Sequence, residues 1–169
     1  VLESLEHAQR RGARIYCEVI GYGASNDAYD MIALHETGRG LKRAMVAAIR
    51  KAGIDPSEID YINPHGSGTP LNDRVETKVF KEVLGEAAYR CAISSVKPIT
   101  GHCMGASGSV EALACVMAIR DQVVPPTINY STPDPECDLD YVPNMARKQP
   151  VRVALSTSVG LGGHNACII

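Results

Sequence analysis

The stretch Ser94–Glu111, SSVKPITGHCMGASGSVE, places an amine, an imidazole and a carboxylate around a glycine-rich turn. The residues before the turn, 91–96, have the composition of a short buried strand, and those after it, 107–122, have the apolar spacing of a helix. Lys97 therefore lies where a strand has just ended, and Glu111 lies near the start of a helix, where a carboxylate is favoured. We expect Lys97 and Glu111 to form an ion pair that holds the ammonium in place.

Strands and helices alternate along the rest of the chain, and this alternation predicts an α/β fold in which helices cover a layered sheet. The expected helices are 1–11, 41–52, 73–84 and 107–122, and the expected strands are 14–23, 59–62, 91–96, 151–159 and 165–169. Pro98 argues against helix directly after Val96. The helix at 107–122 is expected to bury Val110, Leu113, Ala114, Met117 and Ala118. The segment 123–144, rich in proline and aspartate, is expected to be an irregular connector.

Polar turns follow three of the expected strands, at 63–69, 97–102 and 160–165. Because ligands bind outside the carboxyl ends of strands in open sheets, we expect these turns to share one site. Its candidate groups are His65, Lys97, His102 and the Gly162–Gly163 backbone. Imidazoles, a cation and glycine amides, with no convincing nucleophile among them, are suited to stabilising a developing oxyanion or enolate.

Other chemistries have weaker support in the sequence. Cys103 follows His102, but neighbouring residues in a turn rarely present their side chains to each other, and we expect the Cys103 thiol to be packed. The glycine and serine pairs do not complete the G-x-S-x-G pattern of a serine hydrolase. The histidines lack the spacing of zinc ligands, and the glycine-rich turn lacks the lysine and serine of a phosphate loop.

Composition describes an ordinary globular domain of 169 residues with a net charge of −2. This charge favours neither nucleic acid nor an anionic membrane as a partner, and no apolar run is long enough to span a bilayer. The six cysteines form no C-x-x-C pair and are interpreted as reduced thiols. A cytoplasmic location is expected, or the stroma or matrix of an organelle. The chain starts without Met or a secretion signal, so we expect it to be part of a longer protein.

Four motifs carry a resemblance to a known family. They are NPHGSGTPLND at 63–73, SSVKPITGHCMGASGSVE at 94–111, VPPTIN at 124–129 and GLGGHNA at 160–166. In this order they resemble the C-terminal half of a β-ketoacyl-acyl carrier protein synthase of the elongating, KAS II-like kind. The resemblance implies a thiolase-like fold made of two similar α/β halves. It assigns residues 14–169 to the second half and residues 1–13 to a helix at the tail of the first.

The resemblance also implies an activity, decarboxylative Claisen condensation of malonyl-carrier protein with an enzyme-bound acyl group in fatty acid elongation. It assigns catalytic roles to His65, His102 and Lys97 and pairs Glu111 with the lysine. Supporting roles fall to Ser67, Thr69, Leu161 and Gly162. No cofactor is implied, although some relatives hold a monovalent cation, here matched by Asn63, Glu111 and Ser156. The implied partners are an acyl carrier protein, the first half of the enzyme and a second copy in a homodimer.

Several positions depart from the family pattern. The nucleophilic cysteine is expected upstream of Val1, Leu161 stands where a gating phenylalanine is common, and His164 replaces the usual threonine. Within the family, a polyketide ketosynthase or its chain-length partner is the alternative. From another class, the alternative is a non-catalytic interaction module whose surface the missing half or a partner would cover.

Overall fold

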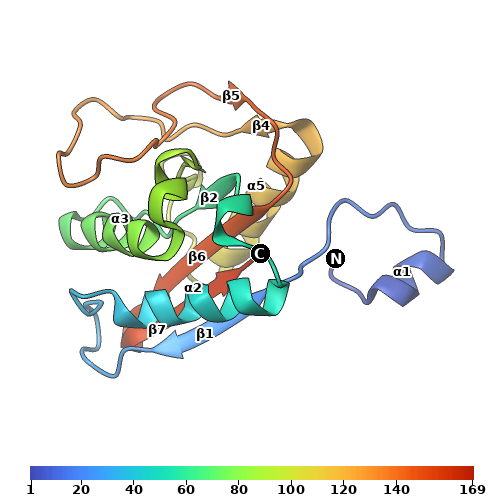
Figure 1. Ribbon diagram of the computed structural model, residues 1–169, viewed down its shortest axis with the longest axis horizontal. Helices are drawn as coiled ribbons and strands as arrows, with labels where there is room; N and C mark the ends of the chain where they lie inside the picture. The colour runs from blue at the N-terminus through green and yellow to red at the C-terminus, as the bar shows by residue number, and fades with distance from the viewer.

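The computed structural model describes all 169 residues and contains one five-stranded mixed sheet, in the order β1-β7-β6-β2-β3 (Figure 1). Its strands are β1 Tyr22–Asn26, β2 Tyr61–Asn63, β3 Ala92–Ile93, β6 Ala154–Gly160 and β7 His164–Ile168. Strands β3, β2 and β6 run parallel, and β7 runs antiparallel to both β6 and β1. The carboxyl ends of the three parallel strands therefore meet at one edge of the sheet.

The α-helices are α1 Leu5–Arg10, α2 Arg39–Ala52, α3 Pro70–Leu84, α4 Lys97–Thr100 and α5 Ser107–Asp121. The three long ones, α2, α3 and α5, pack over the faces of this sheet. Side chains in β2 alternate between the two faces: Ile62 joins the large core formed with α2 and α3, whereas Tyr61 packs with Cys115 and Ala118 of α5. The sheet is thus covered by α2 and α3 on one face and by α5 on the other (Figure 1).

The prediction for α2 is confirmed, apart from a start two residues earlier. Its expected stripe is buried in full and consists of Leu41, Ala44, Met45, Ala48 and Ile49. Gly53, at a φ of 68°, ends the helix in the left-handed conformation that glycine adopts readily. Helix α3 also starts earlier than expected, with Thr69 rather than Asp73 at its N-cap position.

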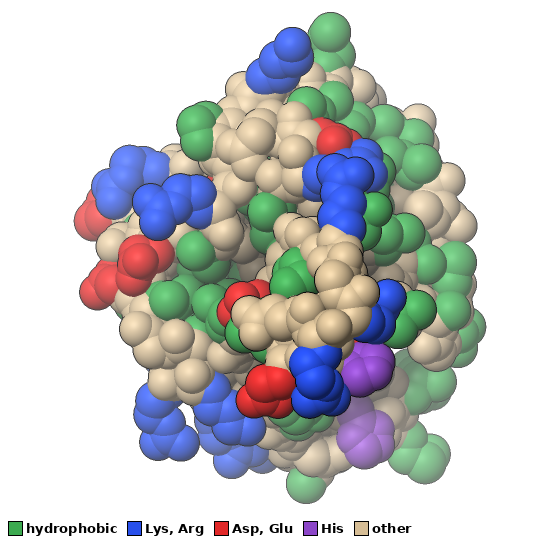
Figure 2. All heavy atoms as spheres, turned by 90° about the vertical axis from the view of Figure 1, so that its right-hand side faces the viewer, with side chains coloured by type: hydrophobic (Ala, Val, Ile, Leu, Met, Phe, Trp, Pro, Cys, Tyr) green, Lys and Arg blue, Asp and Glu red, His purple; other side chains and the backbone are tan.

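The predicted inner face of α5 is confirmed at Ala118, which is buried, but is wrong at two other positions. Leu113 is 59% exposed and Met117 38% exposed, while Glu111 and Cys115 lie against the sheet. The helix carries apolar residues on most sides, so its period alone does not indicate which side packs inward. Hydrophobic side chains gather along the right of Figure 2, the side of the sheet on which α5 lies.

The N-terminal region also differs from prediction. The expected strand at 14–23 forms only from Tyr22 onward, because no strand of this chain lies beside residues 14–19 to complete a ladder. Ile15 and Val19 are exposed as a result. Helix α1 projects away from the rest of the molecule, and of its expected apolar face only Ala8 is buried (Figure 1).

Two further local predictions need correction. Lys97 opens the one-turn helix α4, and Pro98 fits there because the first turn of a helix needs no N–H from it. The connector after α5 is not wholly irregular, since β4 Val123–Val124 pairs with β5 Arg147–Lys148. All six cysteines are free thiols. None of the helices has the length and apolarity that crossing a membrane would require.

Candidate active site

The two candidate histidines are brought together at the carboxyl edge of the sheet. His65 follows β2, and His102 lies in the turn between α4 and α5. Their ring centroids are 5.4 Å apart and the rings meet edge to face at 77°. His65 is half-buried and His102 is exposed. Two imidazoles can therefore reach one small volume at this edge.

Lys97 and Glu111 form the predicted ion pair beneath the histidines. The Lys97 ammonium donates to a Glu111 carboxylate oxygen and to the backbone carbonyl of His65. Both side chains are buried, at 7% and 2% exposure. Burial raises the pKa of the Glu111 carboxyl, and the Lys97 ammonium acts in the opposite direction. The ion pair thus fixes the main chain that carries His65, rather than contacting its ring.

The imidazole tautomer of His102 follows from its contacts. Its Nδ1 lies 3.1 Å from the backbone nitrogen of Met104 and 3.1 Å from the Ser107 hydroxyl. A backbone N–H can only donate, so Nδ1 accepts and the ring proton of the neutral imidazole is on Nε2. A backbone amide of the glycine-rich turn thus holds the inner nitrogen of His102.

The His65 imidazole is held neutral by its surroundings. Burial lowers the pKa of His65 to about 3, and the Lys97 ammonium and His102 act in the same direction. A neutral ring donates one hydrogen bond and accepts another, so His65 can act as a donor without bringing a buried charge.

Glu76 is a site residue that the sequence reasoning missed. Its carboxylate is completely buried and accepts hydrogen bonds from the backbone nitrogens of His65 (2.8 Å) and Gly66 (2.7 Å). It also accepts from the hydroxyl of Thr157 (2.9 Å) and the amide of Asn72 (2.8 Å). Burial raises the pKa of Glu76, and these four donors oppose the rise. The available signal was a carboxylate within the inward stripe of α3.

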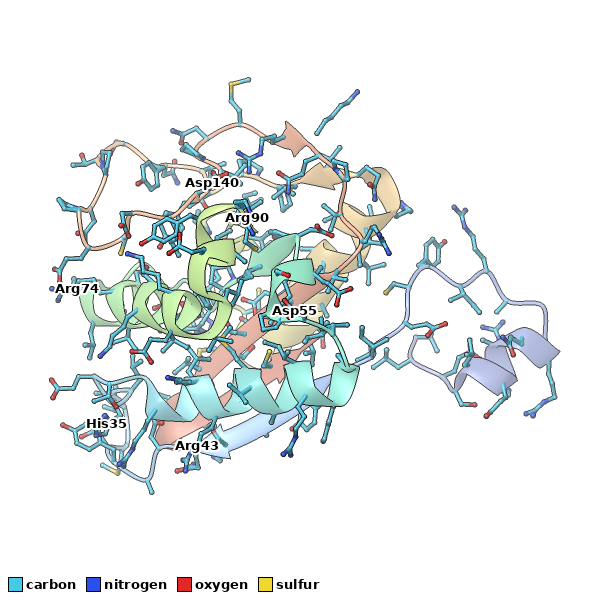
Figure 3. All side chains as sticks on the ribbon, in the orientation of Figure 1. His35, Arg43, Asp55, Arg74, Arg90 and Asp140 are labelled. Carbon is cyan, nitrogen blue, oxygen red and sulfur yellow. The ribbon has the colours of Figure 1, made fainter.

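A groove of about 650 Å³ leads to this cluster from the side of α3. Ser67 and Thr69 line it, with their hydroxyls 3.2 Å apart, and Lys97 and His102 also contribute to its lining. The opposite wall is the connector after α5. Figure 3 labels Arg74 on α3 and Asp140 in this connector, and a salt bridge of 2.7 Å from Arg74 to Glu136 ties the two walls together.

The third polar turn follows β6 and so lies at the same edge of the sheet. Leu161 is 60% exposed. The Gly162 amide donates to the backbone carbonyl of Met31 (2.8 Å), and the Gly162 carbonyl accepts from the side chain of Asn26 (2.9 Å). The Gly162 amide is therefore already bonded within the protein, which leaves Leu161 as the better candidate for a backbone donor.

Cys103 is exposed, so the expectation that it is packed is wrong. Its sulfur lies 3.7 Å from the Thr100 carbonyl and 3.8 Å from the Gly101 carbonyl. The Nδ1 of the adjacent His102 accepts from the Met104 amide, and the Cys103 sulfur makes its hydrogen bonds to these carbonyls rather than to the imidazole. No base is therefore placed to remove the thiol proton, and the geometry gives no support to a nucleophilic pair.

The residues expected around a monovalent cation fit such an ion. Asn63 and Ser156 are opposite each other in the neighbouring strands β2 and β6, and both are buried. The Asn63 amide oxygen and the second Glu111 carboxylate oxygen are buried without a hydrogen-bond partner. Buried oxygen atoms without a partner lower the stability of the folded protein unless a hydrogen-bond donor or a cation contacts them.

The family follows from comparison with known proteins. Residues 16–131 match the family model described as beta-ketoacyl synthase, C-terminal domain. The chain belongs to the beta-ketoacyl synthase family.

Similar proteins carry two kinds of name. The chain is 52% identical over 169 residues to a polyketide beta-ketoacyl synthase 1 of Streptomyces halstedii. This alignment covers 100% of the chain and 40% of that protein. It is also 52% identical over 168 residues to 3-oxoacyl-[acyl-carrier-protein] synthase 2 of Synechocystis sp., covering 99% of this chain and 40% of that protein.

A solved structure with the same fold is a type II PKS acyl-carrier protein in complex with its ketosynthase bound to the hexaketide. The TM-score is 0.94 at 45% identity, over 98% of this chain and 41% of that chain. The thiolase-like C-terminal half expected from the sequence is thus confirmed. The beta-ketoacyl synthase chain described here spans about 40% of the length of these relatives.

Proposed function

We propose that this chain supplies the enolate-stabilising half of an enzyme that performs decarboxylative Claisen condensation. The observation that carries the proposal is the pair of imidazoles, His65 and His102, 5.4 Å apart above a buried ion pair. Neighbouring donors of this kind suit an oxygen on which negative charge develops, because their hydrogen bonds strengthen as the charge grows.

In the proposed step, a malonyl thioester enters the groove. The bond from its carboxylate carbon to the α-carbon breaks, CO2 leaves, and the electron pair passes to the thioester, whose carbonyl oxygen becomes an enolate oxygen. The Nε2 proton of His102 and a ring proton of His65 donate to that oxygen. The α-carbon then attacks the carbonyl of an acyl thioester, and the thiolate of that thioester leaves.

The acyl thioester in this proposal is formed on a cysteine outside the 169 residues. The geometry of Cys103 supports this division, because no base is placed beside its thiol. The neutral state of His65 also supports the proposal, since an imidazolium ion would be costly to desolvate in this pocket.

The remaining assignments belong to the same proposal. Ser67 and Thr69 line the groove and are placed to contact the arm of a carrier-bound substrate. The Leu161 backbone amide, with the amide of the missing cysteine, is assigned to the oxyanion of acyl transfer. Asn63, Glu111 and Ser156 would hold a monovalent cation, which when bound would satisfy the unpaired oxygens of Asn63 and Glu111 and favour the ionised form of Glu111.

The proposed partners are an acyl carrier protein bearing acyl and malonyl groups, the first half of the enzyme and a second copy in a homodimer. A solved relative described as a carrier protein in complex with its ketosynthase supports the first of these. The exposed Leu113 and Met117 on α5 support coverage of that face by the other half. Residues 1–13, which project from the body, are assigned to that other half. Six free thiols support a cytoplasmic location.

Fatty acid and polyketide synthesis share this condensation, and relatives with names of both kinds are equally similar to the chain, at 52% identity. The full-length protein should therefore be incubated with acyl-carrier and malonyl-carrier protein, and the product mass and CO2 release measured. Formation of a 3-oxoacyl thioester, lost in Lys97→Ala and kept in the exposed-surface variant Lys51→Ala, is the expected result. Repeated unreduced extension indicates a polyketide enzyme. Carrier binding without CO2 release would replace the proposal by an interaction module.

A further inference from the structure

We infer that the Tyr61 hydroxyl is a positioning group that fixes the orientation of the Asn63 amide and thereby keeps an oxygen-lined cation site open beside Glu111. This role rests on the monovalent cation proposed above, and adds the residue on which its binding depends. The starting observation is an asymmetry within one side chain. The Asn63 amide nitrogen is hydrogen bonded, whereas its amide oxygen is equally buried and has no partner.

Four buried residues lie together on the α5 side of the sheet. Tyr61 packs against Cys115 of α5, and Asn63, two residues further along β2, points to the same face. Ser156 is in register with Asn63 in the neighbouring parallel strand. Glu111 is buried one helical turn before Cys115. The side chains of Asn63, Ser156 and Glu111 therefore share the space between the sheet and α5.

The hydrogen bonds of Tyr61 decide which end of the amide faces it. The Tyr61 hydroxyl donates its single proton to the backbone carbonyl of Ser94, 3.2 Å away. Because a carbonyl can only accept, that proton is committed, and the phenolic oxygen is left as an acceptor. It accepts from the Ser94 hydroxyl (3.2 Å) and from the Asn63 amide nitrogen (3.1 Å). The NH2 end of Asn63 must therefore face Tyr61.

The amide oxygen of Asn63 is consequently turned away from Tyr61 and remains without a donor. One oxygen of Glu111 is taken by Lys97, and the other is also buried without a partner. An amide flipped by 180° would present two N–H donors instead and repel a cation. Since Lys97 already balances the charge of Glu111, a monovalent ion such as K⁺ or Na⁺ suits this site better than a divalent one.

The test uses the full-length protein, with thermal unfolding followed against K⁺ concentration and choline chloride keeping the ionic strength constant. The parent should gain melting temperature with K⁺, as a ligand that binds only the folded state produces. Tyr61→Phe keeps the ring but frees the amide to turn. Its apparent K⁺ affinity should fall by about tenfold, the equivalent of one lost orienting hydrogen bond.

Ser94→Ala is the matched control. It removes the hydroxyl that donates to Tyr61 but leaves the backbone carbonyl that takes the Tyr61 proton. Its K⁺ affinity should stay close to that of the parent, although it alters the same network. A general weakening of the core would instead lower the K⁺ affinity of both variants alike.

If Tyr61→Phe and the parent have equal K⁺ affinity, Tyr61 does not orient the Asn63 amide, although the proposed cation site stands. If the melting temperature of the parent does not respond to K⁺, both the cation site and the role of Tyr61 are wrong. The condensing activity is tested separately, by CO2 release. If Tyr61→Phe does not fold, crystals of the parent in Rb⁺ provide the answer. An anomalous peak in contact with the oxygens of Asn63 and Glu111 supports the role, and a peak elsewhere or none contradicts it.

Discussion

Glu76 holds the loop that carries His65: one carboxylate oxygen accepts the backbone N–H of His65 at 2.8 Å. The other oxygen accepts the N–H of Gly66 at 2.7 Å. A buried carboxylate with several donors is stable only while all of them stay in place. The main chain that carries the His65 imidazole is therefore held by Glu76 of α3 at its N–H and by Lys97 at its carbonyl.

The first prediction concerns this support. Glu76→Ala leaves the Gly66 backbone amide and the Thr157 hydroxyl without an acceptor in the core, and the His65 amide keeps only the Thr157 oxygen. The free energy of unfolding should therefore fall by about 3 kcal/mol or more. Glu82 lies on the same helix as Glu76, and its exposed carboxylate pairs with Lys42 of α2. Glu82→Ala should cost less than about 1 kcal/mol. Urea denaturation measures both. Equal costs for the two variants would contradict the role of Glu76.

The second prediction concerns the ion pair. Glu111→Ala leaves the Lys97 ammonium buried with only the His65 carbonyl, and the free energy of unfolding should fall by about 3 kcal/mol. Lys97→Ala should lower the free energy of unfolding only a little, although it should lower the rate of condensation strongly. Burial already raises the pKa of Glu111, so without Lys97 this carboxyl can take up a proton and become neutral.

Denaturant melts of the full-length protein check this difference. The control is Asp138→Ala, which removes the largely exposed partner of Lys81 and should shift the midpoint little. An unchanged midpoint for Glu111→Ala counts against the pairing described here.

The third prediction is a pH dependence of stability. The pKa of His65 is about 3 in the folded protein, against an ordinary value of 6.5. Below pH 6.5 the unfolded chain takes up a proton that the folded protein does not, so stability present at neutral pH is lost as the pH falls toward 3. Between pH 7 and pH 5 this loss amounts to at most about 2 kcal/mol.

The check is to compare the parent with His65→Asn in urea at both pH values. The variant lacks the titrating ring, so its loss of stability on acidification should be smaller than that of the parent. His164→Asn, which changes an exposed histidine, serves as the control. Parallel pH profiles for the parent and His65→Asn would show that His65 is not held neutral by the fold.

The fourth prediction is that Cys103 forms no acyl thioester. The thiol is exposed, but the neighbouring His102 nitrogen accepts from Met104 and is not free to act as its base. Intact-mass spectrometry of this chain after incubation with an acyl-carrier thioester should show no adduct, and Cys103→Ser should leave condensation by the full-length protein unchanged. Stoichiometric acylation at Cys103 would overturn this prediction.

The cluster of His65, Lys97, His102 and Glu111 could be predicted because its determinants are local. Each residue follows a strand or begins a helix, and the carboxyl ends of parallel strands meet at one edge. Glu76 could not be assigned in the same way. Its role depends on hydrogen bonds from a loop ten residues earlier and from β6, contacts that helix periodicity does not report.

The errors in the fold have a related cause. Helix α5 is apolar on most sides, so its spacing predicts a helix but not that Leu113 faces outward and Glu111 inward. The segment containing Ile15 and Val19 has the alternation of a strand but no neighbour in this chain to pair with. In both segments the sequence pattern gives the type of element but not the neighbour that it packs against.

The fifth prediction tests the central claim. Each neutral imidazole is proposed to donate to the enolate oxygen, and losing one such donor usually lowers the rate by roughly 10² to 10³. His65→Ala and His102→Ala in the full-length protein should lower malonyl decarboxylation by this amount. Acyl transfer should suffer less, because it uses the separate backbone donors assigned to the Leu161 turn.

The most direct measurement is CO2 release from malonyl-carrier protein by these two variants, recorded separately from acylation of the enzyme by an acyl-carrier thioester. The expected result is a roughly hundredfold or greater loss of decarboxylation with acylation largely retained. Decarboxylation at the parental rate in both His65→Ala and His102→Ala would contradict the enolate-stabilising role of the two histidines.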